Sequence, residues 1–294
     1  MTGRGDAGLL VVDKAMGMTS HDVVAKVRRL AGTRKVGHAG TLDPMATGVL
    51  LLGLNRATRL LGHLMLTEKA YDATVRLGAA SSTDDAEGEL GEPLSTEHLT
   101  EDDVRSAAGG FVGVLQQVPS AVSAIKVDGR RAYQRVREGE DVRLAAREIT
   151  IHELLVTDVR RDGGWLDVDL SVRCSSGTYV RAIARDLGGA LGVGGHLTAL
   201  RRTAVGPFTL SDAHTLDELE GELSMVDISD VARRCFPTCS LDAEEARDVG
   251  YGRALSVDLG DAEGPVAVFD PDGTFLALYR QDGDVAAPVA VFAG

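Results

Sequence analysis

Cysteine is scarce in this sequence, and so are aromatic residues. The 294 residues include only three cysteines, Cys174, Cys235 and Cys239, and the last two form a C-x3-C pair without a second pair of ligands. This spacing favours neither a disulfide framework nor a structural zinc site, so we expect no metal. Aromatic residues make up 4% of the chain, whereas its 44% hydrophobic and 26% charged residues are typical of a globular protein.

Long apolar segments are also missing. The longest runs, 49–54 and 285–293, are interrupted by Gly53 and Pro288 and are too short to cross a bilayer. The first residues contain no apolar segment of the kind found in signal peptides. We therefore expect no membrane span and a cytoplasmic protein.

The net charge of −13 argues at first against a polyanionic partner. The charge is unevenly distributed, however, because residues 1–70 and 173–202 carry an excess of Lys and Arg, whereas 80–105 and 211–294 carry an excess of Asp and Glu. Phosphate binding depends on local clusters of cations and not on the sum over the chain. A nucleic-acid partner is therefore compatible with this composition, although solvated surface charge would give the same pattern.

The pattern of apolar residues predicts a mixed α/β or α+β fold, since strand-like and helix-like runs follow one another along most of the chain. The expected strands are 8–14, 47–54, 71–77, 123–127, 149–159, 165–174 and 197–210. The expected helices are 20–32, 56–65, 102–111, 130–137 and 179–191.

A change of pattern near Phe236 and Pro237 indicates a domain boundary. An acidic, helical pattern over 216–239 is interrupted there, and three short β-runs follow at 266–269, 274–279 and 289–292. A chain of 294 residues has room for one large and one small domain at roughly 150 residues per domain. We expect a large domain over 1–237 and a small β-rich domain over 238–294.

Common catalytic motifs are absent, including the P-loop, H-E-x-x-H and G-x-S-x-G, which leaves nucleotide-phosphate and zinc-hydrolase functions without support. The segment 37–44, GHAGTLDP, instead places Asp43 directly before Pro44. The proline ring disfavours the α region for Asp43 and holds it in an extended or turn conformation. A carboxylate fixed in a loop can act as a nucleophile or base, although an Asp that only caps the next element is the commoner case.

Two further segments combine turn residues with chemically useful side chains. In 174–185, Gly177 permits a tight strand-to-helix turn that would present Tyr179 and Arg181 at the start of a helix; the alternative is a surface Arg181 paired with Asp186. In 117–133, several cations surround a turn, and a plain turn with solvated charges is equally compatible with this sequence.

Together these segments resemble the bacterial tRNA pseudouridine synthases of the TruB type. The similarity extends from about residue 8 to residue 210 and rests on segments 10–20, 37–48, 69–71, 83–88, 119–126, 176–181 and 200–202. Ala15 stands where the family often has proline, and Asp84 and Asp85 replace a more usual Asp-Thr or Asp-Ser.

The resemblance implies a pseudouridine-synthase catalytic domain with a mixed, mainly antiparallel sheet, followed by a small PUA-like RNA-binding domain. It implies that the uridine at position 55 of the tRNA T-loop is flipped out of the stack. The C–N glycosidic bond is then broken and the base is rejoined through C5, without a cofactor. Asp43 matches the catalytic aspartate and would act by covalent attack or by proton abstraction at the sugar.

The resemblance also assigns substrate contacts. His38 would occupy the space that the base leaves, Tyr71 and Tyr179 would pack on or hydrogen-bond the uracil, and Tyr71 would be a poor base for the C5 proton because a phenol has a pKa near 10. Leu200 would line an apolar floor, and Arg181 would favour the ionised catalytic carboxylate.

Charge and position alone suggest which cations contact the RNA backbone: Lys14, Lys35, Lys126, Arg130 and Arg202. Each of them could equally be a solvated side chain. The acidic residues after 210 are expected to face away from RNA, since like charges repel the phosphates. We expect tRNA as the partner, no required protein partner and a monomer.

Two other functions fit parts of the sequence. A non-catalytic protein that binds and folds tRNA could use the same scaffold, although the intact loop around Asp43 argues against it. A nucleoside or glycoside hydrolase could use Asp43 to break a glycosidic bond, but such enzymes usually need a second positioned carboxylate, and the matched segments offer no obvious one.

Overall fold

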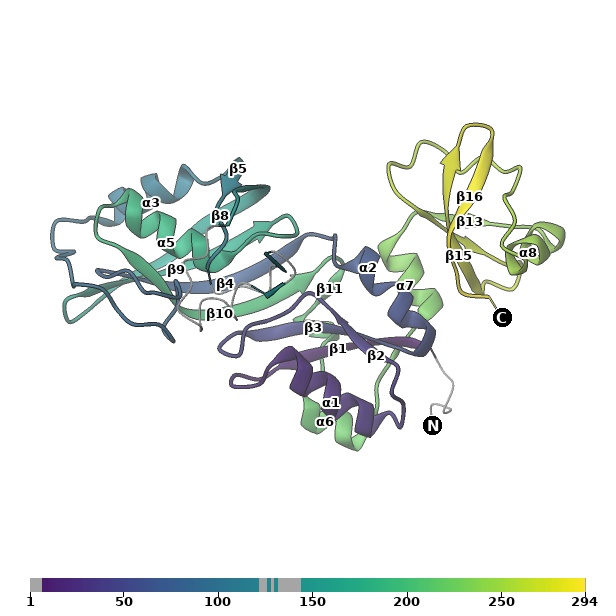
Figure 1. The fold of residues 1–294 in the computed structure, drawn as a ribbon, viewed down its shortest axis with the longest axis horizontal. Helices are drawn as coiled ribbons and strands as arrows, with labels where there is room; N and C mark the ends of the chain where they lie inside the picture. The colour runs from purple at the N-terminus through teal and green to yellow at the C-terminus, as the bar shows by residue number, and fades with distance from the viewer. Residues whose placement is uncertain (1–6, 122–125, 128–129, 132–143, 294) are drawn as a thin grey trace. The chain divides into compact units, whose positions relative to one another are not determined.

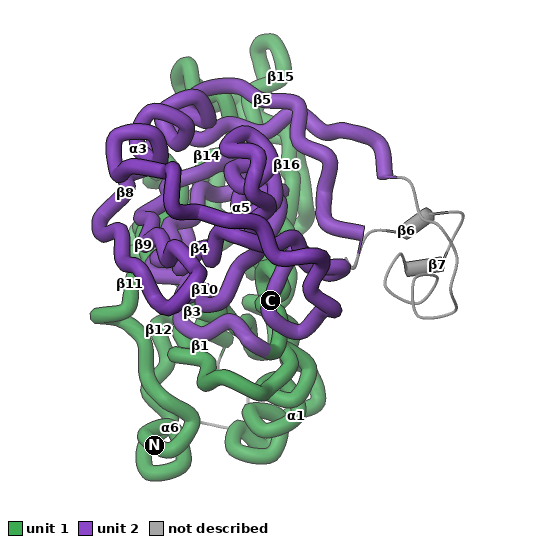
Figure 2. Tube along the Cα trace, turned by 90° about the vertical axis from the view of Figure 1, so that its left-hand side faces the viewer, with its two compact units in different colours: residues 1–44, 49–65, 206–294 green, residues 45–48, 66–205 purple. Residues whose placement is uncertain are grey.

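The computed structural model describes residues 7–121, 126–127, 130–131 and 144–293. The chain divides into two compact units (Figure 2). Unit 1 consists of Met1–Pro44, Val49–Met65 and Gly206–Gly294, and unit 2 consists of Met45–Gly48 and Leu66–Val205. Each unit therefore contains segments that are far apart in the sequence.

Unit 1 opens with the predicted strand and helix, β1 (Gly8–Lys14) and α1 (Ser20–Leu30). Thr19 caps α1 in a capping box with Asp22. Val23, Val24 and Val27, which recur at helical spacing, are buried. The helix therefore begins where the sequence predicts and buries its apolar face. β1 pairs antiparallel with β12 (Val226–Asp227), and β2 (Val36–Ala39) pairs antiparallel with β3 (Thr47–Leu54). The remaining elements up to residue 235 are η1 (Asn55–Arg59), α2 (Leu61–Leu64), β11 (Phe208–Thr209), η2 (Leu210–Asp212), α6 (Leu216–Gly221) and α7 (Ile228–Cys235).

The C-terminal residues form a separate four-stranded sheet, drawn in yellow and light green in Figure 1. Its order is β13 (Thr238–Ser240), β14 (Val266–Phe269), β15 (Phe275–Asp282) and β16 (Val285–Val291). β13 and β14 are parallel and the other two pairs are antiparallel. A core that includes Leu241, Val249 and Tyr279 lies against this sheet, which confirms the predicted β-rich C-terminal part.

Unit 2 is built on a sheet with the order β10 (Gly195–Val205), β4 (Lys69–Leu77), β9 (Trp165–Cys174), β8 (Arg147–Asp162) and β5 (Gly113–Gln117). All four of these pairs are antiparallel, and β10 also pairs in parallel with the first residues of β3. The helix α5 (Val180–Ala190) packs against β10 and β4, and α3 (Glu101–Gly109) packs against β8. The expected mixed, mainly antiparallel α+β fold is confirmed.

Several local predictions need correction. Residues 37–39, expected within the turn-rich stretch 37–44, form β2 together with Val36 because they pair with β3. Arg130–Arg131, expected to begin a helix, form β7, which pairs with β6 (Lys126–Val127); the rest of the expected helix and residues 123–125 lie outside the described residues. The sequence patterns did not predict β5 or α8 (Ala243–Gly250). Within the described parts of the chain, no helix is long and apolar enough to span a membrane.

Candidate active site

Asp43 lies in a loop of unit 1 whose backbone is fixed on its N-terminal side. The Ser20 hydroxyl donates to the carbonyl of Leu42 at 3.1 Å and accepts the N–H of Leu42 at 2.9 Å. Ser20 is buried at the start of α1, and Gly40 takes the positive φ of 81° that the turn requires. Leu42, the residue before Asp43, is thus bonded to α1 through both its N–H and its carbonyl.

The C-terminal side of Asp43 is fixed as well. The carbonyl of Pro44 accepts the N–H of Gly17 at 2.8 Å and the Lys14 ammonium at 3.3 Å. Asp43 itself is half-buried. A carboxylate held between two anchored residues has little positional freedom, which is what a catalytic carboxylate needs.

Lys14, which charge and position suggest as a contact of the RNA backbone, is buried in the structure. Its side chain is 0% exposed, and its ammonium also donates to the carbonyls of Ala15 and Met18, at 3.0 and 2.8 Å. A charged group that bridges three carbonyls has its donors occupied and is inaccessible to a phosphate. Lys14 is therefore part of the support of the Asp43 loop.

His38 lies on β2, five residues before Asp43, and is half-buried. Its ring lies edge-on to that of His21, with ring centroids 5.6 Å apart and an interplanar angle of 80°. His21 belongs to α1, the helix that also carries Ser20. The same helix therefore contacts both His38 and the backbone next to Asp43.

Lys35 is exposed and lies in a polar cavity of about 440 Å³. The other lining residues are Asn55, Arg56, Thr58 and Arg59, so three cations and no acid line it. The guanidinium groups of Arg56 and Arg59 donate to carbonyls near the C-terminus at 3.2 and 2.9 Å. The sequence indicated Lys35 alone, although R-x-x-R in one helical turn was a visible signal.

In unit 2, Arg181 forms a buried ion pair with Asp85 at 3.1 Å, with the two side chains only 6% and 4% exposed. The same guanidinium donates to the carbonyl of Thr83 at 3.1 Å, and the Thr83 hydroxyl donates to Asp85. The alternative of a surface pair with Asp186 is wrong for Arg181. It is Arg185, one helical turn later, that pairs with Asp186.

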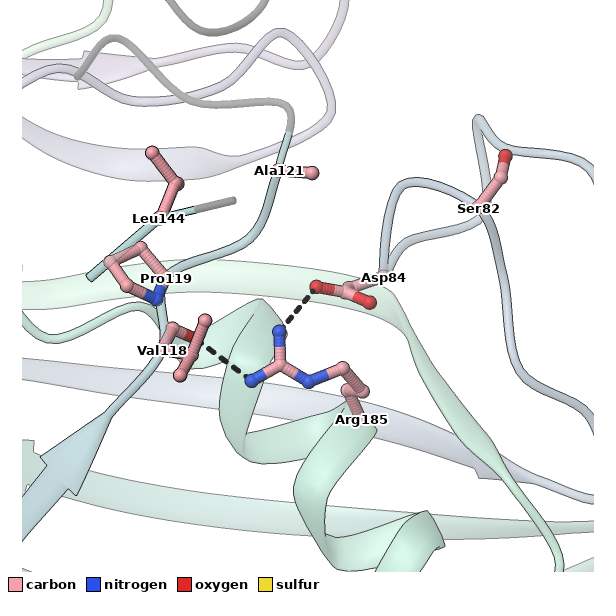
Figure 3. A pocket seen from close by; sticks show the side chains of 7 residues that line it. All are labelled: Ser82, Asp84, Val118, Pro119, Ala121, Leu144 and Arg185. Carbon is pink, nitrogen blue, oxygen red and sulfur yellow. Dashed lines mark hydrogen bonds and ion pairs between the residues drawn. The ribbon is translucent and has the colours of Figure 1, made fainter. Parts of the chain in front are cut away.

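Arg185 joins three segments of unit 2 (Figure 3). It donates to the Asp84 carboxylate at 3.1 Å and to the carbonyl of Val118 at 2.8 Å. These groups line a cavity of about 400 Å³ together with Ser82, Pro119, Ala121 and Leu144. Asp84 and Asp85, consecutive in one loop, thus neutralise two arginines that are four residues apart on α5.

Tyr179 caps α5 and follows the predicted turn, in which Gly177 has a φ of 85°. Its backbone N–H donates to the side-chain oxygen of Gln117 at 2.9 Å, and the Gln117 amide donates to its carbonyl at 3.1 Å. The strand-to-helix turn therefore places Tyr179 and Arg181 at the start of one helix, as expected.

Tyr71 and Lys69 are buried on the same face of β4, where alternate residues point inward. Strand pairing sets Arg202 opposite Tyr71 and Leu200 opposite Ala73. Leu200 is half-buried. The register thus brings together three of the residues that the sequence singled out.

Arg202, another suggested contact of the RNA backbone, is only 1% exposed. Burial, together with the charge of Arg202, lowers the pKa of Lys69 to about 8. Burial raises the pKa of the neighbouring Cys174 thiol to about 11, which makes it an inert structural cysteine.

Comparison with known proteins shows similarity along the whole chain. Residues 28–180 match the model of the TruB family pseudouridylate synthase (N terminal domain), 181–235 match the tRNA pseudouridylate synthase B C-terminal domain, and 236–293 match tRNA Pseudouridine synthase II, C terminal. The chain belongs to the TruB family of pseudouridylate synthases.

Individual relatives agree with this family. The chain is 56% identical to a tRNA pseudouridine synthase B of Arthrobacter sp. (strain FB24), over 98% of this chain and 97% of that protein. It is also 56% identical to the protein of the same name from Thermobifida fusca (strain YX), over 98% and 99%. Among solved structures it resembles one titled "Crystal Structure of a Cbf5-Nop10-Gar1 Complex", with a TM-score of 0.75 and 25% identity over 97% of this chain and 84% of that chain.

Family membership makes the chain an isomerase that converts uridine to pseudouridine in tRNA. The structure adds residues that sequence reasoning missed: Ser20 next to the Asp43 loop of unit 1, and Asp85, Gln117 and Arg185 around the start of α5 in unit 2. A buried Arg181 demands a carboxylate partner, and the unusual Asp84 and Asp85 were the sequence signal for it. Ser20 and Gln117 act on backbone atoms, and the sequence contains no signal for such contacts. Among the described residues, no group of three or more His, Cys, Asp and Glu is placed to hold a metal ion.

Proposed function

We propose that the chain isomerises the uridine at position 55 in the T-loop of tRNA, with Asp43 as the essential catalytic residue. The observation that carries the assignment is the anchoring of Leu42 and Pro44 on either side of Asp43, which fixes one carboxylate in an otherwise turn-rich loop. Asp84 and Asp85, by contrast, are committed to ion pairs with Arg185 and Arg181.

The reaction is redox-neutral and needs no cofactor. The bond between C1′ of the ribose and N1 of uracil breaks, the base turns, and a new bond forms between C1′ and C5. The proton on C5 then leaves and N1 gains a proton, so atoms and electrons balance. Asp43 takes part by covalent attack or by abstraction of a proton from the sugar, and both routes require the ionised carboxylate.

A uridine in the folded T-loop must leave its stack before a side chain can reach its sugar. His38 takes the vacated space, and Tyr71, Tyr179 and Leu200 supply the aromatic and apolar surface that replaces the lost stacking. Arg181, fixed in place by its buried ion pair with Asp85, completes the proposed set of substrate-binding residues. Tyr71 acts mainly by packing against the uracil and not as the base for the C5 proton, since a phenol with a pKa near 10 is a poor proton acceptor at neutral pH.

In this proposal, the cations that contact the RNA backbone are those whose side chains a phosphate can reach. Lys35 with Arg56 and Arg59 forms one cationic cluster in unit 1, and its exposure and lack of lining acids support this role. Lys126 and Arg130 lie on the paired strands β6 and β7 and complete the proposed set. Lys14 and Arg202 are left out because both are buried.

The domain division at residue 237 belongs to the same proposal. Residues 1–237 would carry the chemistry, and the sheet of 238–294 would act as a PUA-like module that adds affinity for whole tRNA. The protein would work as a cytoplasmic monomer without a protein partner. A truncated chain of residues 1–237 is expected to modify a T-stem-loop and to lose affinity for full-length tRNA; a folded truncation without any activity on the stem-loop would overturn this division.

The substitution Asp43→Asn tests the function itself. The change is nearly isosteric, so we expect tRNA binding and the melting temperature to stay close to wild type while pseudouridine formation is lost. Asp72→Asn, an exposed carboxylate on β4, is the matched control and should remain active. Turnover by Asp43→Asn within about tenfold of wild type would refute the assignment. Free uracil as the product of the wild-type protein would indicate a hydrolase, and unchanged uridine a binding protein.

A further inference from the structure

Gln117, the last residue of β5, makes an unusual pair of hydrogen bonds. Its side-chain oxygen accepts the backbone N–H of Tyr179 at 2.9 Å, and its side-chain amide donates to the carbonyl of the same residue at 3.1 Å. The Gln117 side chain is buried, being 6% exposed. A side-chain amide thus pairs with one backbone residue much as a neighbouring strand would.

The partner is the residue at which a helix begins. The first N–H groups of a helix have no intrahelical acceptors. Tyr179 is the N-cap residue of α5, and its side chain does not accept a hydrogen bond from the first turn. The Tyr179 carbonyl also accepts the N–H groups of Ala182 and Ile183, at 3.1 and 3.2 Å. Gln117 therefore holds the peptide groups from which the first turn of α5 is built.

The residue next to Gln117 is tied to the same helix. The carbonyl of Val118 accepts a hydrogen bond from Arg185 at 2.8 Å, while Arg185 also donates to Asp84 (Figure 3). Gln117 and the residue directly after β5, Val118, thus contact α5 at its cap and between one and two turns later. A helix held at two points can neither slide along its axis nor rotate about it without breaking one of these contacts.

We propose that Gln117 is a positioning residue for the isomerisation, which acts by fixing Tyr179 and, two residues later, Arg181. This inference rests on the substrate-binding roles proposed above for these two residues. A small misplacement of groups that contact the reacting nucleotide costs far more in rate than in stability, because the chemistry depends on their alignment. Gln117 has no need to touch the RNA for this effect.

The chemistry of the amide offers a graded series of variants. Glutamine both accepts and donates here, whereas glutamate can only accept, and methionine, which is close in shape, cannot donate and is only a weak acceptor. Gln117→Glu therefore keeps the bond from the Tyr179 N–H and loses the one to its carbonyl. Gln116 is the matched control, because it is the preceding residue of the same strand and is exposed.

The experiment uses the full-length protein and T-arm RNA with wild-type sequence. Single-turnover rate constants at saturating RNA, RNA dissociation constants and melting temperatures are measured for Gln117→Met, Gln117→Glu, Gln116→Met and Gln116→Glu. We expect Gln117→Met to lower the rate constant by about 10- to 100-fold, with Gln117→Glu between it and wild type. The dissociation constants should stay within about threefold, and both Gln116 variants should match wild type.

A rate constant within about twofold of wild type for folded Gln117→Met overturns the proposal, and so does a loss that appears only in the dissociation constant. Should Gln117→Met fail to fold, Gln117→Glu decides in the same way.

Tyr179→Ala separates this proposal from the site assignment. If Tyr179→Ala is itself fully active, the assignment of Tyr179 fails and the role of Gln117 fails with it. If Tyr179→Ala is impaired while the Gln117 variants are not, only the positioning role fails. Gln117→Met should also add no further loss in the Tyr179→Ala background.

Discussion

Arg181 and Asp85 form the most deeply buried ion pair described in unit 2, with a distance of 3.1 Å and both side chains almost inaccessible. The pair costs desolvation, so it gives little net stability, but removal of one partner leaves a buried charge without compensation. A second pair lies beside it, since Asp84, the residue before Asp85, pairs with Arg185, one helical turn after Arg181, at a more exposed position. The two pairs thus differ in burial and share one loop and one helix.

This difference in burial gives a first prediction. Asp85→Asn should lower the free energy of unfolding by about 3 kcal/mol, because Arg181 keeps its charge. Asp84→Asn should cost less than about 1 kcal/mol, since Arg185 is partly solvated and also pairs with Asp186. Asparagine tolerates the positive φ of 62° at this position as aspartate does. Urea denaturation of both variants measures the two values, and equal losses would show that burial does not control them.

Lys14 and Lys35 give a second prediction. The sequence suggests both as contacts of the RNA backbone, but in the structure Lys14 is buried and Lys35 is exposed. Lys14→Met should lower the free energy of unfolding by about 1–3 kcal/mol, since buried carbonyls lose their donor. It should also slow catalysis through the Asp43 loop. Lys35→Met should change stability by less than about 0.5 kcal/mol, as expected of a surface site, and should weaken RNA binding. Stability, rate and affinity are measured for both. A Lys14 variant that is stable and impaired only in binding would restore the sequence-based assignment.

The buried ammonium of Lys69 gives a third prediction, on pH and stability. Its pKa is lowered from 10.5 to about 8 in the folded protein, so the unfolded chain binds more protons between these two values. The free energy of unfolding must then rise with pH across this window, whereas well below pH 8 the destabilisation by the buried ammonium is fully present and Lys69 adds no pH dependence. Relative to Lys69→Met, which does not titrate, the wild type should gain on the order of 2–3 kcal/mol from pH 8 to 10.5. A constant difference between the two proteins over this range would show that the pKa of Lys69 is normal.

Much of the fold could be predicted because local patterns and tertiary pairing agree. The helix that Thr19 caps has its valines at helical spacing, and the strand 165–174 alternates regularly and pairs over its full length. The residues 37–39 open the turn-rich stretch 37–44, and pairing with β3 makes them part of a strand. Local preference is weak in such a segment, so contacts distant in the sequence decide.

The site could be predicted less completely, for a related reason. Asp43, Tyr179 and Arg181 lie in segments whose turn residues and family resemblance mark them. The burial of Lys14 and Arg202 depends on carbonyls and strands elsewhere in the chain. A lysine in a sequence gives no sign of whether its charge faces water, because the aliphatic stem suits either environment. Charge and position alone therefore assigned two buried cations to the RNA surface.

The last prediction concerns salt. Each phosphate that a cation neutralises contributes a slope of roughly −0.7 to −0.9 in a plot of log affinity against log salt. Five contacts would therefore cost about a hundredfold or more between 50 and 200 mM salt, despite the net charge of −13. Lys35→Gln should make the slope shallower by about one contact. Lys26→Gln should leave it unchanged, because Lys26 already pairs with Glu220 at 2.8 Å. Affinity for tRNA is measured at fixed pH and magnesium. Recognition mainly through apolar packing around the flipped base would instead give a slope shallower than about −2, and the cluster of Lys35, Arg56 and Arg59 would then be ordinary solvated surface.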